Sequence, residues 1–262
     1  MKKLISMLLL ATMCIPAYSQ ILSSRTFGEK KKNPTTWYVR AGLSLNNLTG
    51  PAMSIAKREL KEEISDSKEE GNNFKAGFGT RVGYDLEVGF RKNFGTTNLY
   101  WGMELGLGTR GGKFKVSEKY EDGDYRNEGS HIQMYNFKYS PFQIGYLYKI
   151  KDNISLDAHL GIFASIDFAK NYKQWYKTED IDESTSGSDI DWDDVGHTAF
   201  DAGLKLGIGV WYGRYNFDIS WQRGFAPFVE GYPFDDDHWD DRHGETKQFC
   251  SSNLIISVGY SF

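Results

Sequence analysis

The sequence has little proline, little cysteine and no long apolar run after residue 20. Proline accounts for 6 of the 262 residues and cysteine for 2. No later segment reaches the roughly 18 apolar residues of a membrane-spanning helix, which excludes a bundle of such helices. Positive charge is not in excess either, because the formal net charge is −4. That balance argues against a general nucleic-acid-binding protein, so no nucleic-acid partner is expected.

Glycine and aromatic residues, by contrast, are abundant. The chain has 28 glycines, 15% aromatic residues and 40% hydrophobic residues. Such a composition can bury a sizeable core and favours many strands over a helical bundle.

The N-terminus has the three parts of a secretory signal peptide. Lys2 and Lys3 precede an apolar segment, 4–15, and the small residues of 17–19 predict cleavage before Gln20. We therefore expect the protein to be exported.

Export divides the chain into a signal peptide at 1–19, a polar periplasmic segment at 20–35 and one domain at 36–262. Cys14 leaves with the signal peptide. Cys250 then has no partner, so no intramolecular disulfide is expected.

Most of the domain alternates between apolar and polar or small residues with a period of two. FDAGLKLGIGVWY at 200–212 is the clearest case, because its two rows separate in a strand and would mix in a helix. Pro141 marks a phase slip that predicts a β-bulge. The pattern predicts eight strands, at 36–47, 76–91, 97–109, 133–150, 153–169, 198–212, 214–226 and 249–262.

The connections between these strands alternate between long and short. This alternation is typical of outer-membrane barrels, whose periplasmic turns are short and extracellular loops long. The predicted fold is therefore all-β, an eight-stranded antiparallel up-and-down transmembrane β-barrel with long extracellular loops. The long loops are expected at 48–75, 110–132, 170–197 and 227–248.

An apolar-inside barrel of the lipocalin type would show the same period, so the chemistry of the two rows decides between them. In the second predicted strand the small and charged row is Gly77, Gly79, Arg81, Gly83, Asp85, Glu87 and Gly89, and the bulky row is Phe78, Val82, Tyr84, Leu86, Val88 and Phe90. Small and polar inside with bulky apolar outside indicates a lipid-embedded barrel. An aromatic girdle at the short-turn end supports this, formed by Trp37, Phe90, Trp101, Tyr148, Tyr212, Tyr215 and Phe262.

The inward rows carry six positive and seven negative side chains. Buried charges are stable when they are paired, so we expect a closed salt-bridge network rather than a proton or ion path. Its expected members are Arg40, Arg81, Arg91, Lys138, Lys149, Lys205, Asp85, Glu87, Glu104, Asp157, Asp167, Asp201 and Asp218, with His159 beside them.

His159 carries the enzyme hypothesis, with Asp157, Ser155 and Ser165 on the same face. A lipid-A-modifying hydrolase or acyltransferase would need such a set at the outer rim. Without a local signature, a network histidine is the preferred interpretation, and no enzyme activity is expected.

The last two long loops are acidic and hold the weak metal candidates. Asp189, Asp191 and Asp193 resemble the start of a calcium loop but lack its glycine and its final glutamate. His238 and His243 lie among aspartates that could help bind a transition metal. A solvated acidic loop is the alternative, and no cofactor is expected. In the first loop, 51–64 has helical spacing and predicts a surface helix.

The motifs FDAGLKLGIGVWYGRYNFDISWQRGFAPF at 200–228, SPFQIGYLYKI at 140–150 and NLIISVGYSF at 253–262 resemble the PorT-like outer-membrane β-barrel family, whose architecture is related to OmpA- and OmpX-type barrels. The resemblance implies the outer membrane of a Gram-negative bacterium, contact with outer-membrane lipid and lipopolysaccharide, and no shared catalytic residues. Phe262 is similar to the terminal aromatic signal for barrel-assembly machinery. We expect a structural or interaction role through the acidic surface loops, where a protein partner could bind. Some members of the family are linked to protein secretion, so an accessory secretion role is the alternative.

Overall fold

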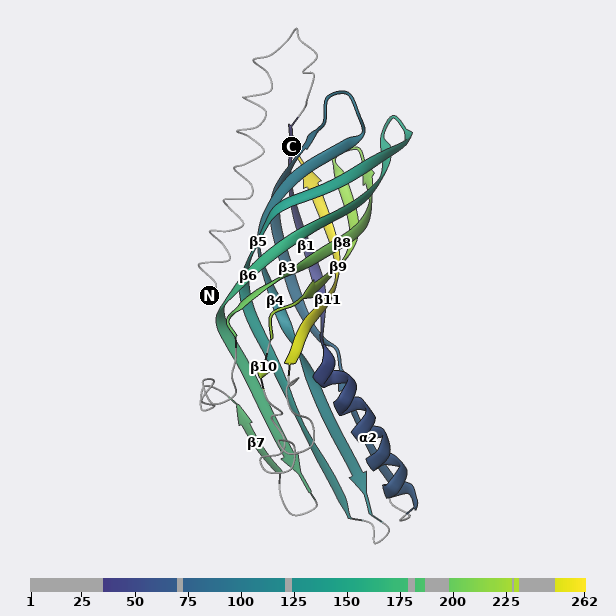
Figure 1. The fold of residues 1–262 in the computed structure, drawn as a ribbon, viewed down its shortest axis with the longest axis vertical. Coiled ribbons are helices and arrows are strands. Elements are labelled where there is room, and N and C mark those ends of the chain that lie inside the picture. The colour runs from purple at the N-terminus through teal and green to yellow at the C-terminus, as the bar shows by residue number, and fades with distance from the viewer. Residues whose placement is uncertain are drawn as a thin grey trace.

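The protein forms one antiparallel sheet closed into a barrel (Figure 1). The computed structural model describes residues 35–69, 73–120, 124–178, 182–186, 198–227, 229–230 and 248–262. Each strand of the ring pairs with the next, and the last pairs with the first, so the prediction of an eight-stranded barrel is confirmed. The ring strands are β1 (Thr35–Thr49), β3 (Arg81–Asn93), β4 (Leu99–Lys119), β5 (Tyr125–Lys151), β6 (Ile154–Lys177), β8 (Phe200–Tyr212), β9 (Tyr215–Gly224) and β11 (Gln248–Ser261). The signal peptide predicted at 1–19 lies outside the described residues.

Four further elements attach to the long-loop end of this ring. They are the helix α2 (Pro51–Glu69) and the strands β2 (Asn73–Gly79), β7 (Asp182–Ser186) and β10 (Val229–Glu230). β2 pairs with β4, β7 with β6 and β10 with β11. Within the described residues no helix has the length and apolarity to cross a membrane.

The strands β4, β5 and β6 run well past the ring and carry β2, β7 and α2 alongside them (Figure 1). We call these parts, 51–69, 73–79, 110–120, 124–134, 170–178 and 182–186, the extension. The prediction of a loop at 110–132 is therefore wrong, because β4 continues to Lys119 and β5 begins at Tyr125. Alternation continues through 113–119, but frequent lysines made the segment resemble a solvated loop.

The predicted strand at 76–91 is also wrong, since it is divided at Thr80 into β2 and β3. Between the pairs Gly79–Lys113 and Asp85–Gly108, five residues (80–84) lie opposite four on β4 (109–112). This extra residue switches the faces, so Phe78 turns from the expected lipid side to pack beside Phe114, with ring centroids 4.9 Å apart.

The bulge expected at Pro141 is confirmed. The register between β5 and β6 shifts between Tyr139 and Phe142, and the β4–β5 register shifts at the same place. The shift keeps apolar residues outward on both sides of the proline, with Phe137 and Tyr146 both exposed.

The outer wall of the barrel is apolar. Ile208 is 64% exposed and Leu206 52% exposed, whereas the intervening Gly207 faces the interior. At the short-turn end, aromatic rings lie side by side across strands: Trp37 and Phe90 are 5.2 Å apart, and Phe90 and Trp101 5.3 Å apart. This is the distribution of a lipid-facing wall with an interfacial girdle.

The helix predicted at 51–64 is confirmed and continues to Glu69. Its first turn places Ala52 and Met53 against Phe249, and Leu60 packs on Phe114 and Val116. These partners come from the side of the sheet that continues the barrel interior, so α2 covers the interior side of the extension.

Candidate functional site

A cluster of five charged side chains forms the centre of the barrel interior. Lys205 is fully buried, and its Nζ lies 2.6 Å from Glu87 Oε1 and 2.6 Å from Glu104 Oε2. Arg40 lies beside both carboxylates, bonds Glu104 and approaches Asp218 to 3.3 Å. These charges come from β1, β3, β4, β8 and β9, so they link strands on opposite sides of the ring.

Lys138 extends the cluster from β5. Its Nζ bonds Asp85 and lies 3.6 Å from Glu87. Asp85 and Glu87 therefore pair with a buried ammonium, as a buried charge requires.

Aromatic groups close the interior toward the short-turn end. Tyr100 and the Trp211 indole both donate to Asp157, at 2.7 and 2.9 Å. Arg91 stacks over Trp211 at 4.0 Å and lies 3.9 Å from the same carboxylate. Tyr38, Tyr100, Leu147 and Trp211 form one buried cluster across the end of the barrel.

His159 lies between two carboxylates. Its Nδ1 is 3.8 Å from Asp157 Oδ1 and 3.8 Å from Asp218 Oδ2, and its imidazole is fully buried. Within the described residues neither ring nitrogen has a hydrogen-bond partner. A Cβ at Gly207 would lie 2.2 Å from His159 Nε2, so this position requires glycine for the ring to fit. The imidazole is therefore packed in the barrel interior, at the same distance from the two carboxylates.

A second ion-pair centre lies toward the long-loop end, and it joins two predicted carboxylates to an arginine that was not predicted. Arg110 donates to Asp167 at 2.7 Å and to the Thr198 carbonyl at 2.8 Å, and lies 3.1 Å from Asp201. Ser251 donates to Asp201 at 2.6 Å. The prediction ended its third strand at 109 and so missed Arg110. The row of Glu104, Gly106 and Gly108 would have identified it, because continued alternation points residue 110 inward.

Two predicted members lie outside this ion-pair network. Arg81 is half-buried and donates from Nε to Gln133 at 3.1 Å, and it forms no ion pair with any residue in the described ranges. Lys149 is exposed near the β5–β6 turn. Both stand at the ends of their rows, where the barrel interior opens.

The metal candidates Asp189, Asp191, Asp193, His238 and His243 lie outside the described residues. In the part of the chain that the structure describes, no group of three or more His, Cys, Asp or Glu side chains is arranged to hold a metal ion.

Phe262 lies at the end of β11, where its backbone N–H donates to the Trp37 carbonyl at 2.9 Å. Its ring is half-buried and lies 5.6 Å from that of Tyr260. The last residue therefore joins the girdle next to the strand that closes the ring.

Solved structures with a similar trace include a neisserial surface protein and an outer-membrane protein of Yersinia pestis. Neisserial surface protein A is 11% identical, with a TM-score of 0.36, and the match covers 87% of this chain and 99% of that one. The attachment invasion locus protein Ail of Yersinia pestis, solved with the heparin analogue sucrose octasulfate, is 11% identical with a TM-score of 0.31, over 87% and 99% of the two chains. The translocator domain of the autotransporter NalP from Neisseria meningitidis is 11% identical with a TM-score of 0.24, over 98% of each chain.

No curated protein matches the chain. The family model described as the outer membrane protein beta-barrel domain matches residues 5–262. That range includes all eight strands of the ring, its apolar outer wall and its charged interior. The chain therefore belongs to the outer-membrane β-barrel domain family.

Proposed function

We propose that the protein is a closed outer-membrane barrel that holds its extension outside the cell as an interaction surface. The observation that carries the proposal is the Lys205 cluster, in which a buried ammonium is bound by two carboxylates across the lumen. An eight-stranded barrel has just enough interior for its side chains. Because side chains fill the interior, we assign the function to the extension and the surface loops, where a partner can bind.

The finer proposal places the protein among PorT-like barrels of a Gram-negative outer membrane, exported by the signal peptide at 1–19. The motifs at 200–228 and 253–262 support it. Its proposed partners are outer-membrane lipid and lipopolysaccharide, barrel-assembly machinery during biogenesis, and a protein at the acidic loops.

A secretion-accessory role is the alternative within the same proposal. The length of the extension favours a protein contact, because β4 and β5 present a paired hairpin far beyond the barrel. Pull-down from crosslinked outer membranes tests this role. Recovery of secretion-machine subunits supports it, and their absence while envelope proteins are recovered contradicts it.

Enzyme activity is not part of the proposal, because the candidate His159 is enclosed within the barrel and away from the outer rim. The test is the lipid A profile of a deletion strain. An unchanged profile is expected, and a changed acylation pattern restored by the wild-type gene would support the enzyme alternative.

Planar-bilayer recording on the refolded protein tests the closed interior. We expect no steady conductance, because the charges pair across the lumen instead of surrounding a water column. Ohmic conductance of porin size would overturn the proposal.

A further inference from the structure

The sheet of the extension has two distinct sides. β4 and β5 pair without a register shift from Glu104 to Lys119, so alternate residues keep their side throughout. On one side Phe114 and Val116 pack against Leu60 of α2. The other side continues the row of Leu105, which is 57% exposed on the lipid-facing wall. We call this second side the outer face of the extension.

The outer face is rich in lysine. Lys113, Lys115 and Lys119 of β4 alternate on it, and Gly77 and Gly79 of β2 pair with Lys115 and Lys113, which places Lys75 on the same face. Lys173 of β6 is opposite His131, which in turn is opposite Lys113. The outer face therefore carries five lysines: Lys75, Lys113, Lys115, Lys119 and Lys173. All five are exposed, and none forms an ion pair with a described residue.

Acidic side chains of the extension lie mainly on the opposite side. Glu118 and Glu128 alternate with the lysine row and therefore point toward the side of α2. Asp182 of β7 is paired on the outer face, where its Oδ2 bonds Lys177 Nζ at 2.5 Å. The sheet therefore separates charge by face and leaves the outer face strongly positive.

Small residues keep this face open. Lys115 is flanked by Gly77 and Gly129, and a Cβ at Gly77 would meet no atom within 4 Å. Trp175 lies over Gly129, and its ring is 6.1 Å from that of His131. The face is thus a shallow, accessible surface on which lysines can reach one ligand from several strands.

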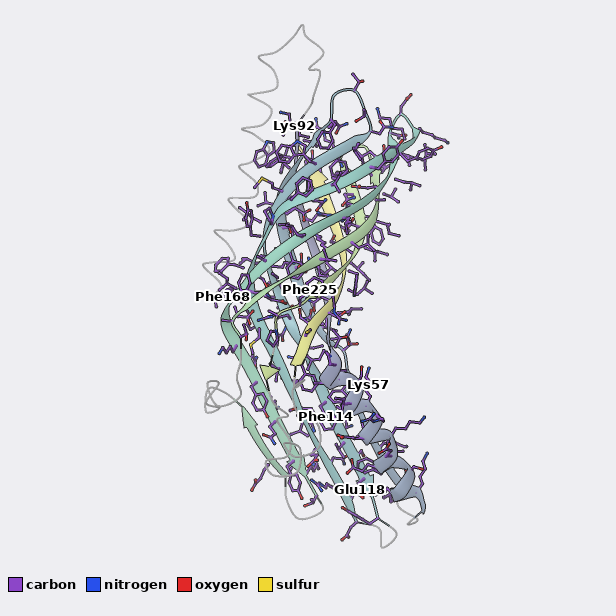
Figure 2. The ribbon with its side chains drawn as sticks, viewed as in Figure 1. Lys57, Lys92, Phe114, Glu118, Phe168 and Phe225 are labelled. Carbon is purple, nitrogen blue, oxygen red and sulfur yellow. The ribbon has the colours of Figure 1, made fainter. Side chains whose placement is uncertain are left out.

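Its position relative to the lipid-facing wall indicates what covers it. The wall ends in an outer aromatic group in which Phe137 and Phe168 lie 4.8 Å apart and Tyr84 and Tyr135 6.1 Å apart. Figure 2 shows Phe168 and Phe225 at one height, where the barrel gives way to the extension. Aromatic rings prefer the membrane interface. Lys113 is four residues beyond Thr109, the partner of Tyr135, which is about 13 Å along the strand. At the usual strand tilt this is about 9–11 Å along the membrane normal, so Lys113 lies just beyond the interfacial rings, on the outer side of the membrane.

We propose that the outer face binds the phosphate groups of glycolipid headgroups in the outer leaflet. Ammonium groups and phosphates are complementary in charge, and clustered lysines next to a membrane bind anionic lipid surfaces. The acyl chains of the same lipid would lie against the apolar wall below. The inference rests on the proposed location of the extension outside the cell.

The test measures phosphorylated lipid retained by the purified full-length protein. The protein is placed in nanodiscs of zwitterionic phospholipid with bisphosphorylated lipid A, extracted, and weighed by native mass spectrometry. We expect lipid A to remain bound, and dephosphorylated lipid A to be lost. The triple variant K113Q/K115Q/K173Q should retain at least about tenfold less lipid A than the wild type.

A matched control removes the same charge from the other side of the sheet. Lys57, Lys61 and Lys68 are exposed on α2, so K57Q/K61Q/K68Q should retain lipid A as the wild type does. Equal retention by both triple variants and the wild type would overturn the inference, as would an equal loss in both variants. Lysine-dependent capture of a soluble sulfated polysaccharide without lipid A retention would also overturn it.

Heat-modifiability and bilayer recording of the same samples separate this inference from the proposed function. If the wild-type protein is folded and does not conduct but loses lipid A, the lipid-binding inference alone is overturned. A conducting barrel that retains lipid A overturns the closed-barrel proposal alone.

Discussion

Lys205 is the residue on which the barrel interior depends most. Replacing it with methionine leaves Glu87 and Glu104 without the ammonium that lies 2.6 Å from each. Breaking a buried ion pair by removing one partner costs about 3–5 kcal/mol, and here Arg40 and Lys138 would compensate the two carboxylates only in part. We expect Lys205→Met to lower the free energy of unfolding by about this amount in denaturant titrations in lipid vesicles.

The double variant Lys205→Met with Glu87→Gln should recover part of that loss. Lys149→Met serves as the control, because Lys149 also stands in an inward row but is exposed at its end. Its replacement should change the free energy of unfolding by less than about 0.5 kcal/mol. Equal destabilisation by Lys205→Met and Lys149→Met would contradict the network.

Leu206, next to Lys205, tests the opposite face. It is the middle residue of β8 and lies on the outer wall between Leu160 and Trp221. An arginine on the lipid face near the bilayer midplane costs about 2–4 kcal/mol. Leu206→Arg should show this loss in vesicle unfolding, while Leu206→Ile should cost less than about 1.5 kcal/mol. Tolerance of the arginine would mean that this face does not contact lipid.

Single residues also show what alternation could and could not predict. Alternation alone predicts that Arg40, Glu104 and Lys205 face the interior. It could not identify their partners, because pairing across the lumen depends on strand stagger. Arg110 was missed since it stands just past an expected strand end.

At the scale of elements, α2 is held to the extension by its apolar stripe. Leu60 is buried against Phe74, Phe114 and Val116. Truncating such a leucine costs about 2–5 kcal/mol. We expect Leu60→Ala to weaken docking of α2 and to speed amide exchange across 51–69 by at least about thirtyfold. Exchange in the ring strands should not change, and the exposed Lys61→Ala should leave both regions as they are.

Docking of α2 should also depend on pH. Partial burial, with Glu118 nearby, raises the pKa of Glu63 above its usual value, although Arg126 acts in the other direction. A carboxyl whose pKa is higher in the docked state than in the undocked state favours docking while it is protonated. This contribution is complete below the pKa of the undocked state and is lost as the pH rises through the pKa of the docked state.

Amide exchange corrected for intrinsic pH effects should therefore show tighter docking at mildly acidic pH than at neutral pH. Glu63→Gln should remove most of this dependence. A pH dependence that survives the substitution would assign it to another group.

The elements were predictable where one period persists, as in β8 and β11. The division of the segment 76–91 at Thr80 was not predictable. A single extra residue moves the following side chains to the other face of the sheet but leaves the composition of the segment unchanged. The lengths of β4, β5 and β6 were underestimated, since lysines on one face of a protruding sheet resemble a loop in sequence.

For the whole molecule, orientation in the membrane is the property to test. An epitope tag inserted at Ser186, in β7 of the extension, should be labelled on intact cells. A tag at Gly213, in the tight β8–β9 turn, should be labelled only after the outer membrane is opened. Labelling at Gly213 alone would invert the topology.

The ring of eight strands followed from the sequence because alternation, turn spacing and the chemistry of the two rows agree. The acidic loops at 187–197 and 231–247 lie outside the described residues, so their metal candidates stay predictions.

The pairing of β1 with β11 has a consequence for how the chain reaches its fold. Tyr38 faces Ser261 and Thr49 faces Cys250, so the contacts that close the ring join the two ends of the domain. Contacts so distant in sequence slow folding, because a long loop must close before they form. Until the last strand arrives, β1 presents an unpaired edge that other chains could join. A chain lacking β11 would retain two such edges, on β1 and β9, and should aggregate even though its other strands are intact.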